Sequence, residues 1–404
     1  PGTYKVALTV TTEDGIGAYT LIRRIDIFPV LTVTPNIPYN ETFSTGTAGW
    51  IDQGMVDSLG ISLDRSSWKL KVPNGFNIPG NQGNAWITDN TGSPSAANDT
   101  KYNGNEQSYV ESPCFDINAL NRPMVSFSYF SDTDQGSDGV VVLYTIDDGQ
   151  NWFRLGSKGR GIDWYNTVPI LGRPGEAFSS NNTDNQGWSG NDQAATGKWN
   201  TARFGLDEVL VRMNKDGVTN KIVRFRVAFG SNADNTPNIK FDGFAFDNFQ
   251  VSNRNRLVLS EYFINQTVEN AANLDAASHQ FAQNLSEMVN IHYHTDFPGV
   301  DEINKTSEKD VSGRSFYYGI RNVPRIVVDG QTQDVVPVLT DGDPDNWAEA
   351  IFSIKSLTPA PFVLNIANPT ASNGRLNVEV DVTALEEVNS QTVVHVVVID
   401  STVE

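Results

Sequence analysis

Apolar and polar residues alternate near both ends of the chain, and this period of two predicts β-strands there. Near the start the alternating apolar positions, on either side of a turn at Asp14-Gly15, are Tyr4, Val6, Leu8, Val10, Tyr19, Leu21, Ile25 and Ile27. They predict a hairpin within residues 1–34. Because an isolated hairpin is marginally stable in water, we interpret it as the closing strands of a sandwich that begins before Pro1.

The long segment 37–253 combines short strand patterns with turn clusters, and helical periodicity is almost absent from it. The strand signals are residues 124–130, 140–145, 152–155, 222–229 and 244–251. This pattern predicts a two-sheet sandwich or jelly roll. The polar loop 172–198 is long enough that we expect it either to be functional or to be held by tertiary contacts.

Strands and helices alternate from Arg256 onward. An apolar helical stripe with steps of three and four is formed by Leu274, Ala277, Phe281, Leu285 and Met288. Strand patterns at 257–263, 289–293 and 326–328 and a last helix at 347–354 complete the series. Residues 256–358 are therefore predicted to form an α/β layer domain.

A C-terminal β-sandwich fragment is expected in residues 359–404. It begins at the helix-breaking segment Pro359-Ala360-Pro361. Leu376, Val378, Val380 and Val382 alternate in a strand pattern, and residues 392–399 form another apolar strand signal. Because the sequence stops before a sandwich could close, we expect the chain to be the middle of a longer protein.

The composition narrows the classes of partner. The 404 residues carry 29 Lys and Arg against 48 Asp and Glu, a formal net charge of −19. Such a charge argues against nucleic acid and anionic membranes as partners. No apolar run approaches the roughly 18 residues of a membrane helix, so no membrane-spanning segment is predicted. The single cysteine, Cys114, rules out an internal disulfide framework and is expected to be buried and unreactive.

Two regions resemble modules of extracellular proteins. The opening segment 1–10, with Gly2-Thr3-Tyr4 before an alternating strand, resembles the end of a PKD-type immunoglobulin-like domain, which implies a spacer. The second region resembles the MAM and cleaved-adhesin jelly rolls of secreted Bacteroidota proteins. The segments that carry this resemblance are 112–116, 125–129, 137–140, 147–152, 187–190 and 242–248.

The third region is similar to a thioredoxin-like outer-membrane protein family of the same phylum. The similarity lies in Glu261-Tyr262-Phe263, in the segment 292–295, and in the segment 318–325 with its Val323-Pro324, a proline that is cis in thioredoxin folds. The family's two cysteines are replaced by Val268 and Ala271. Because disulfide exchange needs a thiolate, the resemblance implies a redox-inactive domain.

Calcium is the cofactor that the acidic residues suggest. Asp132, Asp134 and Asp138 place three carboxylates within seven residues, and hard cations prefer several such oxygens. Asp242 and Asp247 are possible distant ligands. The spacing does not match an EF-hand, and acidic hairpin tips without metal are common. A glycosidase carboxylate pair from the same residues is a weaker alternative.

Histidines offer few further sites. His292 and His294 lie two apart on a predicted strand, so they share a face and could bind one metal. No Asp or Glu of convincing spacing completes that set, and the outward face of a thioredoxin-type strand is the simpler interpretation. His279 and His395 are interpreted as structural. No serine–histidine–aspartate hydrolase fits the second domain, because no histidine precedes His279.

Seven of the eight tryptophans fall in the second domain, and most are expected to fill its core. Trp164 and Trp188 lie in Gly- and Asn-rich loops and are the expected exceptions, exposed for stacking against sugars. Residues 148–152 also resemble the Asp-box turn of sialidases, which describes a hairpin rather than an activity.

Taken together, the patterns and resemblances predict a non-catalytic, modular, mainly β protein of the cell surface or the extracellular space. We expect export by the type IX secretion machinery of a Bacteroidota cell, and a role in adhesion, surface-complex assembly or gliding motility. Short Asp-Ser/Thr patterns at 57–59 and 400–402 fit the O-glycosylation signal of that phylum. Two alternatives remain open: a carbohydrate-binding or carbohydrate-active protein, and a peptide-binding accessory subunit of an outer-membrane complex that uses the groove near Val323 and Pro324.

Overall fold

The computed structural model describes residues 2–13, 18–54, 66–73, 78–79, 83–89, 102–176, 184–191, 197–232, 241–285, 287–332, 347–389 and 392–399. The chain divides into two compact units, Pro1–Asn253 and Arg254–Glu404. That division falls where the sequence pattern changes from strands alone to alternating strands and helices. None of the helices formed by these residues is long and apolar enough to cross a membrane.

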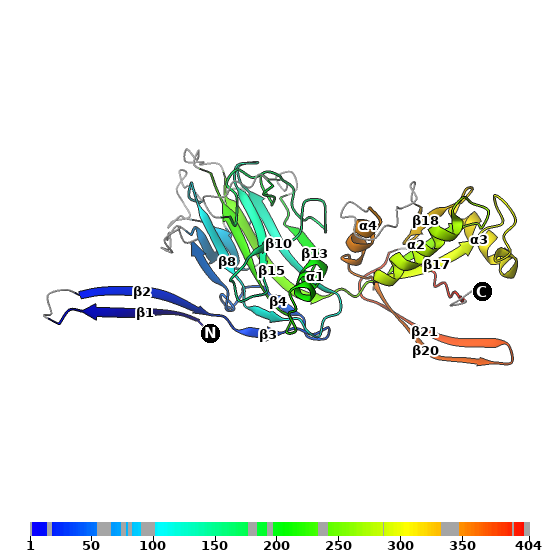
Figure 1. The fold of residues 1–404 in the computed structure, drawn as a ribbon, viewed down its shortest axis with the longest axis horizontal. Coiled ribbons are helices and arrows are strands. Elements are labelled where there is room, and N and C mark those ends of the chain that lie inside the picture. The colour runs from blue at the N-terminus through cyan, green and yellow to red at the C-terminus, as the bar shows by residue number, and fades with distance from the viewer. Residues whose placement is uncertain are drawn as a thin grey trace. The chain divides into compact units, whose positions relative to one another are not determined.

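The first unit contains a β-sandwich of two sheets, as the pattern of short strands predicts (Figure 1). One sheet has the order β13 (Asn200–Gly205), β10 (Pro123–Asp132), β15 (Gly243–Asn253), β7 (Ala85–Thr88) and β6 (Trp68–Lys71), with β4 (Tyr39–Glu41) also paired to β15. The other has the order β12 (Phe153–Arg154), β11 (Gly139–Thr145), β14 (Ile222–Gly230), β8 (Gln107–Glu111) and β5 (Ile51–Gly54). Its strand β9 (Cys114–Asp116) pairs with β14 and, in parallel, with β3 (Val30–Thr32).

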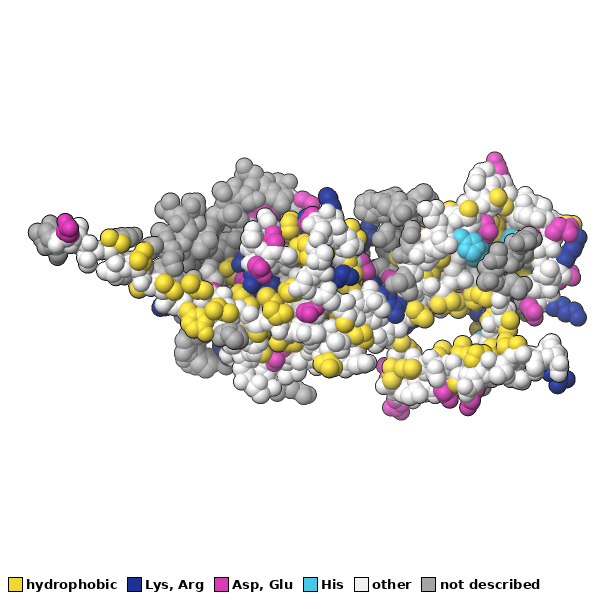
Figure 2. All heavy atoms as spheres, turned by 60° about the horizontal axis from the view of Figure 1, so that its bottom comes forward, with side chains coloured by type: hydrophobic (Ala, Val, Ile, Leu, Met, Phe, Trp, Pro, Cys, Tyr) yellow, Lys and Arg dark blue, Asp and Glu magenta, His cyan; other side chains and the backbone are white. Residues whose placement is uncertain are grey.

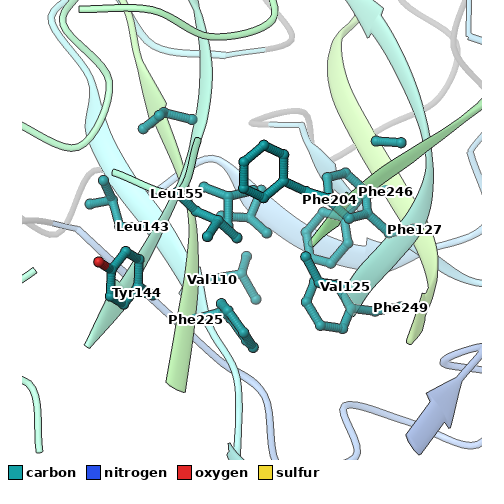
Figure 3. Close-up of a cluster of buried hydrophobic side chains, with 14 of the residues drawn as sticks. Val110, Val125, Phe127, Leu143, Tyr144, Leu155, Phe204, Phe225, Phe246 and Phe249 are labelled. Carbon is teal, nitrogen blue, oxygen red and sulfur yellow. The ribbon is translucent and has the colours of Figure 1, made fainter. Parts of the chain in front are cut away.

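Aromatic side chains from both sheets fill one core between them (Figure 3). Phe127 and Phe249 of the first sheet stack with ring centroids 5.7 Å apart, and Phe225 of the second sheet lies 5.9 Å from Phe249. Each of these three side chains is fully buried. Burial of such large rings is the main stabilising contribution to the sandwich.

The first unit also contains a hairpin and a helix that are not part of the two sandwich sheets. The predicted hairpin is present as β1 (Gly2–Thr11) and β2 (Ala18–Ile27), an antiparallel pair with Gly2 opposite Ile27. A helix that the strand-dominated pattern did not predict, α1 (Asp207–Lys215), follows β13. It buries Val209 and Met213, four residues apart on one helical face, against the sandwich core.

The second unit has a four-stranded mixed sheet of order β17 (Met288–His294), β16 (Val258–Ile264), β18 (Arg325–Val328) and β19 (Gln331–Thr332). β16 is parallel to β17 and antiparallel to β18. Its helices are α2 (Ala271–Asn284), the 3₁₀ turn η1 (Asn304–Thr306), α3 (Glu308–Tyr318) and α4 (Trp347–Ser356). The predicted α/β layer is thus observed (Figure 1).

Alternation along β16 divides the hydrophobic core of this unit into two layers. Tyr262 packs with Phe281 of α2 and Phe352 of α4 on one face of the sheet. Phe263, the next residue, packs with Tyr293 and with Val311 of α3 on the opposite face. The helices therefore cover both faces, and β17 has one face against α2.

Two predicted elements differ from the structure, and one observed strand was not predicted. The apolar stripe predicted a helix reaching Met288, but α2 ends at Asn284, because Leu285 is already extended and Met288 begins β17. The segment 392–399 is apolar but forms no strand. Strand β20 (Phe362–Ser372), which the sequence did not single out, pairs instead with β21 (Arg375–Ala384).

Candidate functional site

The outward face of the sheet that contains β14 carries a cluster of charged and aromatic side chains. We call Tyr109, Glu111, Trp152, Arg224 and Arg226 the guanidinium–aromatic cluster. Its position follows from strand alternation: the residues between these positions on β8 and β14 point into the core. Cross-strand pairing places Glu111 of β8 directly opposite Arg226 of β14.

One carboxylate organises two guanidinium groups in this cluster. Oε1 of Glu111 lies 2.8 Å from Nε of Arg224, and Oε2 lies 2.8 Å from Nε of Arg226. The side chain of Glu111 is only 6% exposed, against 18% for Arg226. Because the ion pairs are largely shielded from water, they hold both planar guanidinium groups in fixed orientations.

Aromatic rings complete the arrangement. The guanidinium carbon of Arg226 lies 3.8 Å from the ring centroid of Tyr109 and 3.7 Å from that of Trp152. Arg224 lies 4.3 Å from the ring centroid of Phe28. These are cation–π distances, so rings and guanidinium groups alternate across the sheet face.

The hairpin that precedes β12 positions Trp152. Asp147 accepts hydrogen bonds from the backbone N–H of Asn151 at 2.9 Å and from Oγ1 of Thr145 at 2.8 Å. The indole N–H of Trp152 donates to the carbonyl of Gly149 at 3.2 Å. Gly149 has φ +87°, a backbone conformation that residues with a side chain rarely adopt, so this position favours glycine. The half-buried indole is therefore held rigidly beside the arginines.

The tryptophans predicted to be exposed are not. Trp164 is 3% exposed and Trp188 is 0% exposed. Their rings pack against each other with centroids 5.0 Å apart, and the indole N–H of Trp164 donates to the carbonyl of Leu155 at 3.0 Å. The loop residues around them fold over the sandwich, so these side chains are core and cannot stack on a ligand. The general expectation that most tryptophans fill the core is confirmed, and the half-buried exceptions are Trp152 and Trp199.

The predicted calcium ligands lie at one end of β10, β11 and β15. Asp138 is fully buried and accepts hydrogen bonds from the Tyr102 hydroxyl at 2.8 Å and the Asn232 N–H at 2.9 Å. Asp132 accepts the N–H of Asp242 at 2.7 Å and the side-chain amide of Asn191 at 2.9 Å. In the described part of the chain, these carboxylates form no group of three within 4.8 Å of one another. Calcium at Asp132, Asp134 and Asp138 stays a prediction.

The two distant candidates are also buried. Asp242 accepts the N–H of Ile78 at 2.7 Å, which ties β15 to residue 78. Asp247 lies within β15 and accepts the N–H of Asn248 at 2.7 Å. Burial raises the pKa of Asp247 to about 6.

In the second unit, Val268 and Ala271, which the thioredoxin resemblance aligns with a cysteine pair, lie at the start of α2. Ala271 is the first residue of that helix, and Val268 packs against the same core layer. Val323 and Pro324 are half-buried and joined by a cis peptide bond, next to β18. In the first unit, Cys114 is buried, and this burial raises the pKa of its thiol.

The histidines are arranged differently from the sequence prediction. His294 contacts Asp301, with Nδ1 and Oδ2 3.0 Å apart, whereas His292 contacts Asp275 at 2.6 Å and lies beside His279. The interpretation of His292 as part of an outward-facing strand surface is wrong, because α2 covers that face. His279, interpreted as structural, is exposed. Figure 2 shows that histidine side chains reach the molecular surface. The sequence offers no carboxylate of convincing spacing beside His292. The structure places Asp275 there, on α2 rather than on the strand.

No protein-family model matches the chain, and no curated protein matches it. Similar solved structures include the K1 and K3 cleaved adhesin domains of Lys-gingipain from Porphyromonas gingivalis, each with 16% sequence identity and a TM-score of 0.27. The K1 match covers 54% of this chain and 99% of that chain, and the K3 match covers 53% and 98%. A structure of carbohydrate-binding modules from the β-sandwich superfamily has 13% identity and a TM-score of 0.25, and covers 62% of this chain and 74% of that chain. Similarity at this level does not establish a family or an activity.

Proposed function

We propose that this chain is part of a non-catalytic binding protein of the cell surface or the extracellular space, and that its β-sandwich binds glycans. The guanidinium–aromatic cluster is the observation that supports this proposal. It presents a half-buried indole and two half-buried guanidinium groups on one sheet face, and a largely buried carboxylate holds the guanidinium groups in place. Of the tryptophans described in the first unit, Trp152 is the one that belongs to such a polar cluster.

The chemistry of the cluster suits a sugar ring. The C–H face of a pyranose stacks on an indole, and its hydroxyl groups form paired hydrogen bonds with planar charged side chains. Glu111 and the aromatic neighbours already fix the guanidinium groups, so little side-chain entropy is lost on binding. A rigid polar site that needs no proton transfer fits recognition rather than catalysis.

Export and display complete the proposal. We infer that the protein reaches the surface of a Bacteroidota cell through the type IX secretion machinery and serves adhesion, surface-complex assembly or gliding motility. The support is the resemblance of two consecutive regions, the jelly roll and the thioredoxin-like region, to exported modules of that phylum. The possible O-glycosylation signals at 57–59 and 400–402 lie outside the described residues. Protease treatment of intact cells tests this inference: we expect digestion of the protein, and its loss from the surface when type IX secretion is disabled.

Glycan binding is tested with Trp152→Ala. A glycan array identifies a ligand, and titration calorimetry then compares the variant with the wild type. Loss of one stacking platform is expected to weaken binding at least tenfold, a change of about 1.4 kcal/mol. The matched control is Trp199→Ala, which removes another half-buried tryptophan that packs on Phe130. Absence of any glycan ligand, or equal affinity of Trp152→Ala and wild type, contradicts the proposal, and release of reducing sugar would indicate the carbohydrate-active alternative.

A further inference from the structure

Three side chains with metal-binding atoms converge in the second unit, which does not contain the proposed glycan site. Asp275, His279 and His292 each offer a ligand atom, and these atoms all lie within 4.8 Å of one another. We call them the histidine–aspartate cluster. Within the ranges that the structure describes, no other group of three His, Cys, Asp or Glu residues converges in this way.

The fold explains why these residues meet. Asp275 and His279 are four residues apart on α2, so they occupy neighbouring positions on one helical face. His292 lies on β17, opposite Tyr262 of β16 in the parallel pair, and so points to the sheet face that α2 covers. The imidazole rings of His279 and His292 lie 4.5 Å apart with an interplanar angle of 35°.

Hydrogen bonds hold the central imidazole in place. Nδ1 of His292 lies 2.6 Å from Oδ1 of Asp275. Nε2 lies 3.1 Å from Oγ of Ser278 and 2.6 Å from the side-chain amide of Asn290.

We propose that the histidine–aspartate cluster binds one Zn²⁺ ion, through an imidazole nitrogen of each histidine and a carboxylate oxygen of Asp275. Two imidazoles and a carboxylate are a ligand set that zinc accepts. The ion replaces the hydrogen bond between Nδ1 of His292 and Oδ1 of Asp275. It cross-links α2 to β17.

The geometry needs only small adjustments. Zinc–ligand distances of 2.0–2.1 Å in a tetrahedron place ligand atoms about 3.3 Å apart, compared with the present limit of 4.8 Å. His279 is exposed, so its ring can rotate toward the other two side chains without repacking the core. Three protein ligands leave the fourth position to water, on the solvent side of His279.

Buried polar atoms beside the cluster are available as outer partners. In the described structure, Oδ1 of Asn290 and the hydroxyl of Tyr262 are buried without a hydrogen-bond partner. Rotation of the Asn290 amide brings Oδ1 to the side of Nε2, where it can accept the N–H that His292 carries when Nδ1 ligates the metal. Histidine ligands in metal sites are commonly oriented by such an acceptor. Tyr262, whose ring lies 5.2 Å from that of His292, is a second polar group beside the site.

A hydrolytic triad is a different interpretation of the same contacts. Ser278, His292 and Asp275 follow the order hydroxyl, imidazole and carboxylate that activates a serine nucleophile. Ser278 is only 1% exposed, however, so a substrate carbonyl cannot reach its oxygen. His279 is the exposed member of the group. A hydrolytic triad would not use this side chain, whereas a metal site would.

The test measures zinc binding by the tag-free chain against a chromogenic zinc indicator, with X-ray absorption to identify the ligands. We expect one zinc ion per chain, a spectrum with two imidazole ligands, and a rise in the melting temperature of the second unit. His279→Gln, which changes an exposed side chain and leaves the core intact, is expected to weaken binding at least tenfold. His292→Gln is expected to abolish it. His395→Gln is the matched control, because it removes an exposed histidine outside the cluster.

The outcomes are decisive in both directions. Binding that persists in His279→Gln, or that His395→Gln reduces equally, means surface histidines bind the metal and overturns the site. Absence of stoichiometric zinc in the wild type overturns it as well. Labelling of Ser278 by a fluorophosphonate probe would establish the triad instead. Glycan binding is unaffected by any of these results, so the two proposals fail separately.

Discussion

Two aspartates, Asp138 in the first unit and Asp275 in the second, lie in opposite situations. In the first unit, Asp138 is fully buried and its two carboxylate oxygens accept hydrogen bonds from Tyr102 and Asn232. In the second, the side chain of Asp275 is 32% exposed and faces imidazole rings. A buried carboxylate that the chain itself satisfies fixes loops, whereas one that faces nitrogen ligands near solvent remains available for a cation. The same residue type therefore serves stability in one unit and ligand binding in the other.

Replacing Asp138 should have the largest effect. Asp138→Ala leaves the Tyr102 hydroxyl and the Asn232 N–H without their acceptor in a buried site, and the expected loss of stability is about 3 kcal/mol. Urea unfolding followed by tryptophan fluorescence measures it, because seven of the eight tryptophans lie in the first unit. Asp138→Asn keeps one acceptor oxygen and is expected to be intermediate.

Asp275→Ala is the matched comparison in the second unit. Its partly exposed ion pair should contribute less than about 1 kcal/mol, since solvent screens it. Hydrogen exchange of the β17 amides measures this contribution. If the two alanine variants are destabilised equally, the contrast between a structural and an available aspartate does not hold.

Sequence pattern alone predicted most of the fold. Alternation located β1, β2, β17 and β21, and the change of period at residue 256 lies within three residues of the division between the units. The helical stripe continued past the true end of α2, because Leu285 and Met288 keep the helical spacing while the backbone turns into β17. The segment 392–399 shows another way in which the pattern misleads. It has the apolar residues of a strand, but it forms no strand in the structure.

The candidate sites were less predictable, because they depend on which strands become neighbours. Glu111 is more than a hundred residues from Arg224 and Arg226, and only the pairing of β8 with β14 brings them together. The spacing of Asp275 and His279 was readable as one helical face. Their contact with His292 required knowing that α2 packs on that side of β17.

The pH dependence of folding stability tests the role of Asp275 through a smaller expected effect. The pKa of Asp275 is lowered in the folded state by its contact with His292, so ionised Asp275 stabilises the fold above the ordinary carboxylate pKa of about 3.9. This stabilisation is lost as the pH falls through the lowered folded-state value. Wild type should therefore be more stable than Asp275→Asn at about pH 6, and the difference should shrink as the pH falls below the ordinary carboxylate pKa of about 3.9. A difference that is independent of pH would show that Asp275 acts through packing alone.

Calcium should have the smallest of the expected effects on stability, in contrast to zinc in the second unit. Asp132 and Asp138 already accept hydrogen bonds from the chain, so an ion at these residues must compete with donors that are in place. Asp134 is only half-buried, and its carboxylate accepts no hydrogen bond from the residues described. It is the ligand with most freedom to bind a cation. Millimolar calcium is therefore expected to raise the melting temperature of the first unit by no more than about 2 °C, and Asp134→Ala should remove that rise. A shift that persists in Asp134→Ala places calcium elsewhere, and the absence of any shift in the wild type leaves these aspartates as hydrogen-bond acceptors that hold the loops at this end of the sandwich.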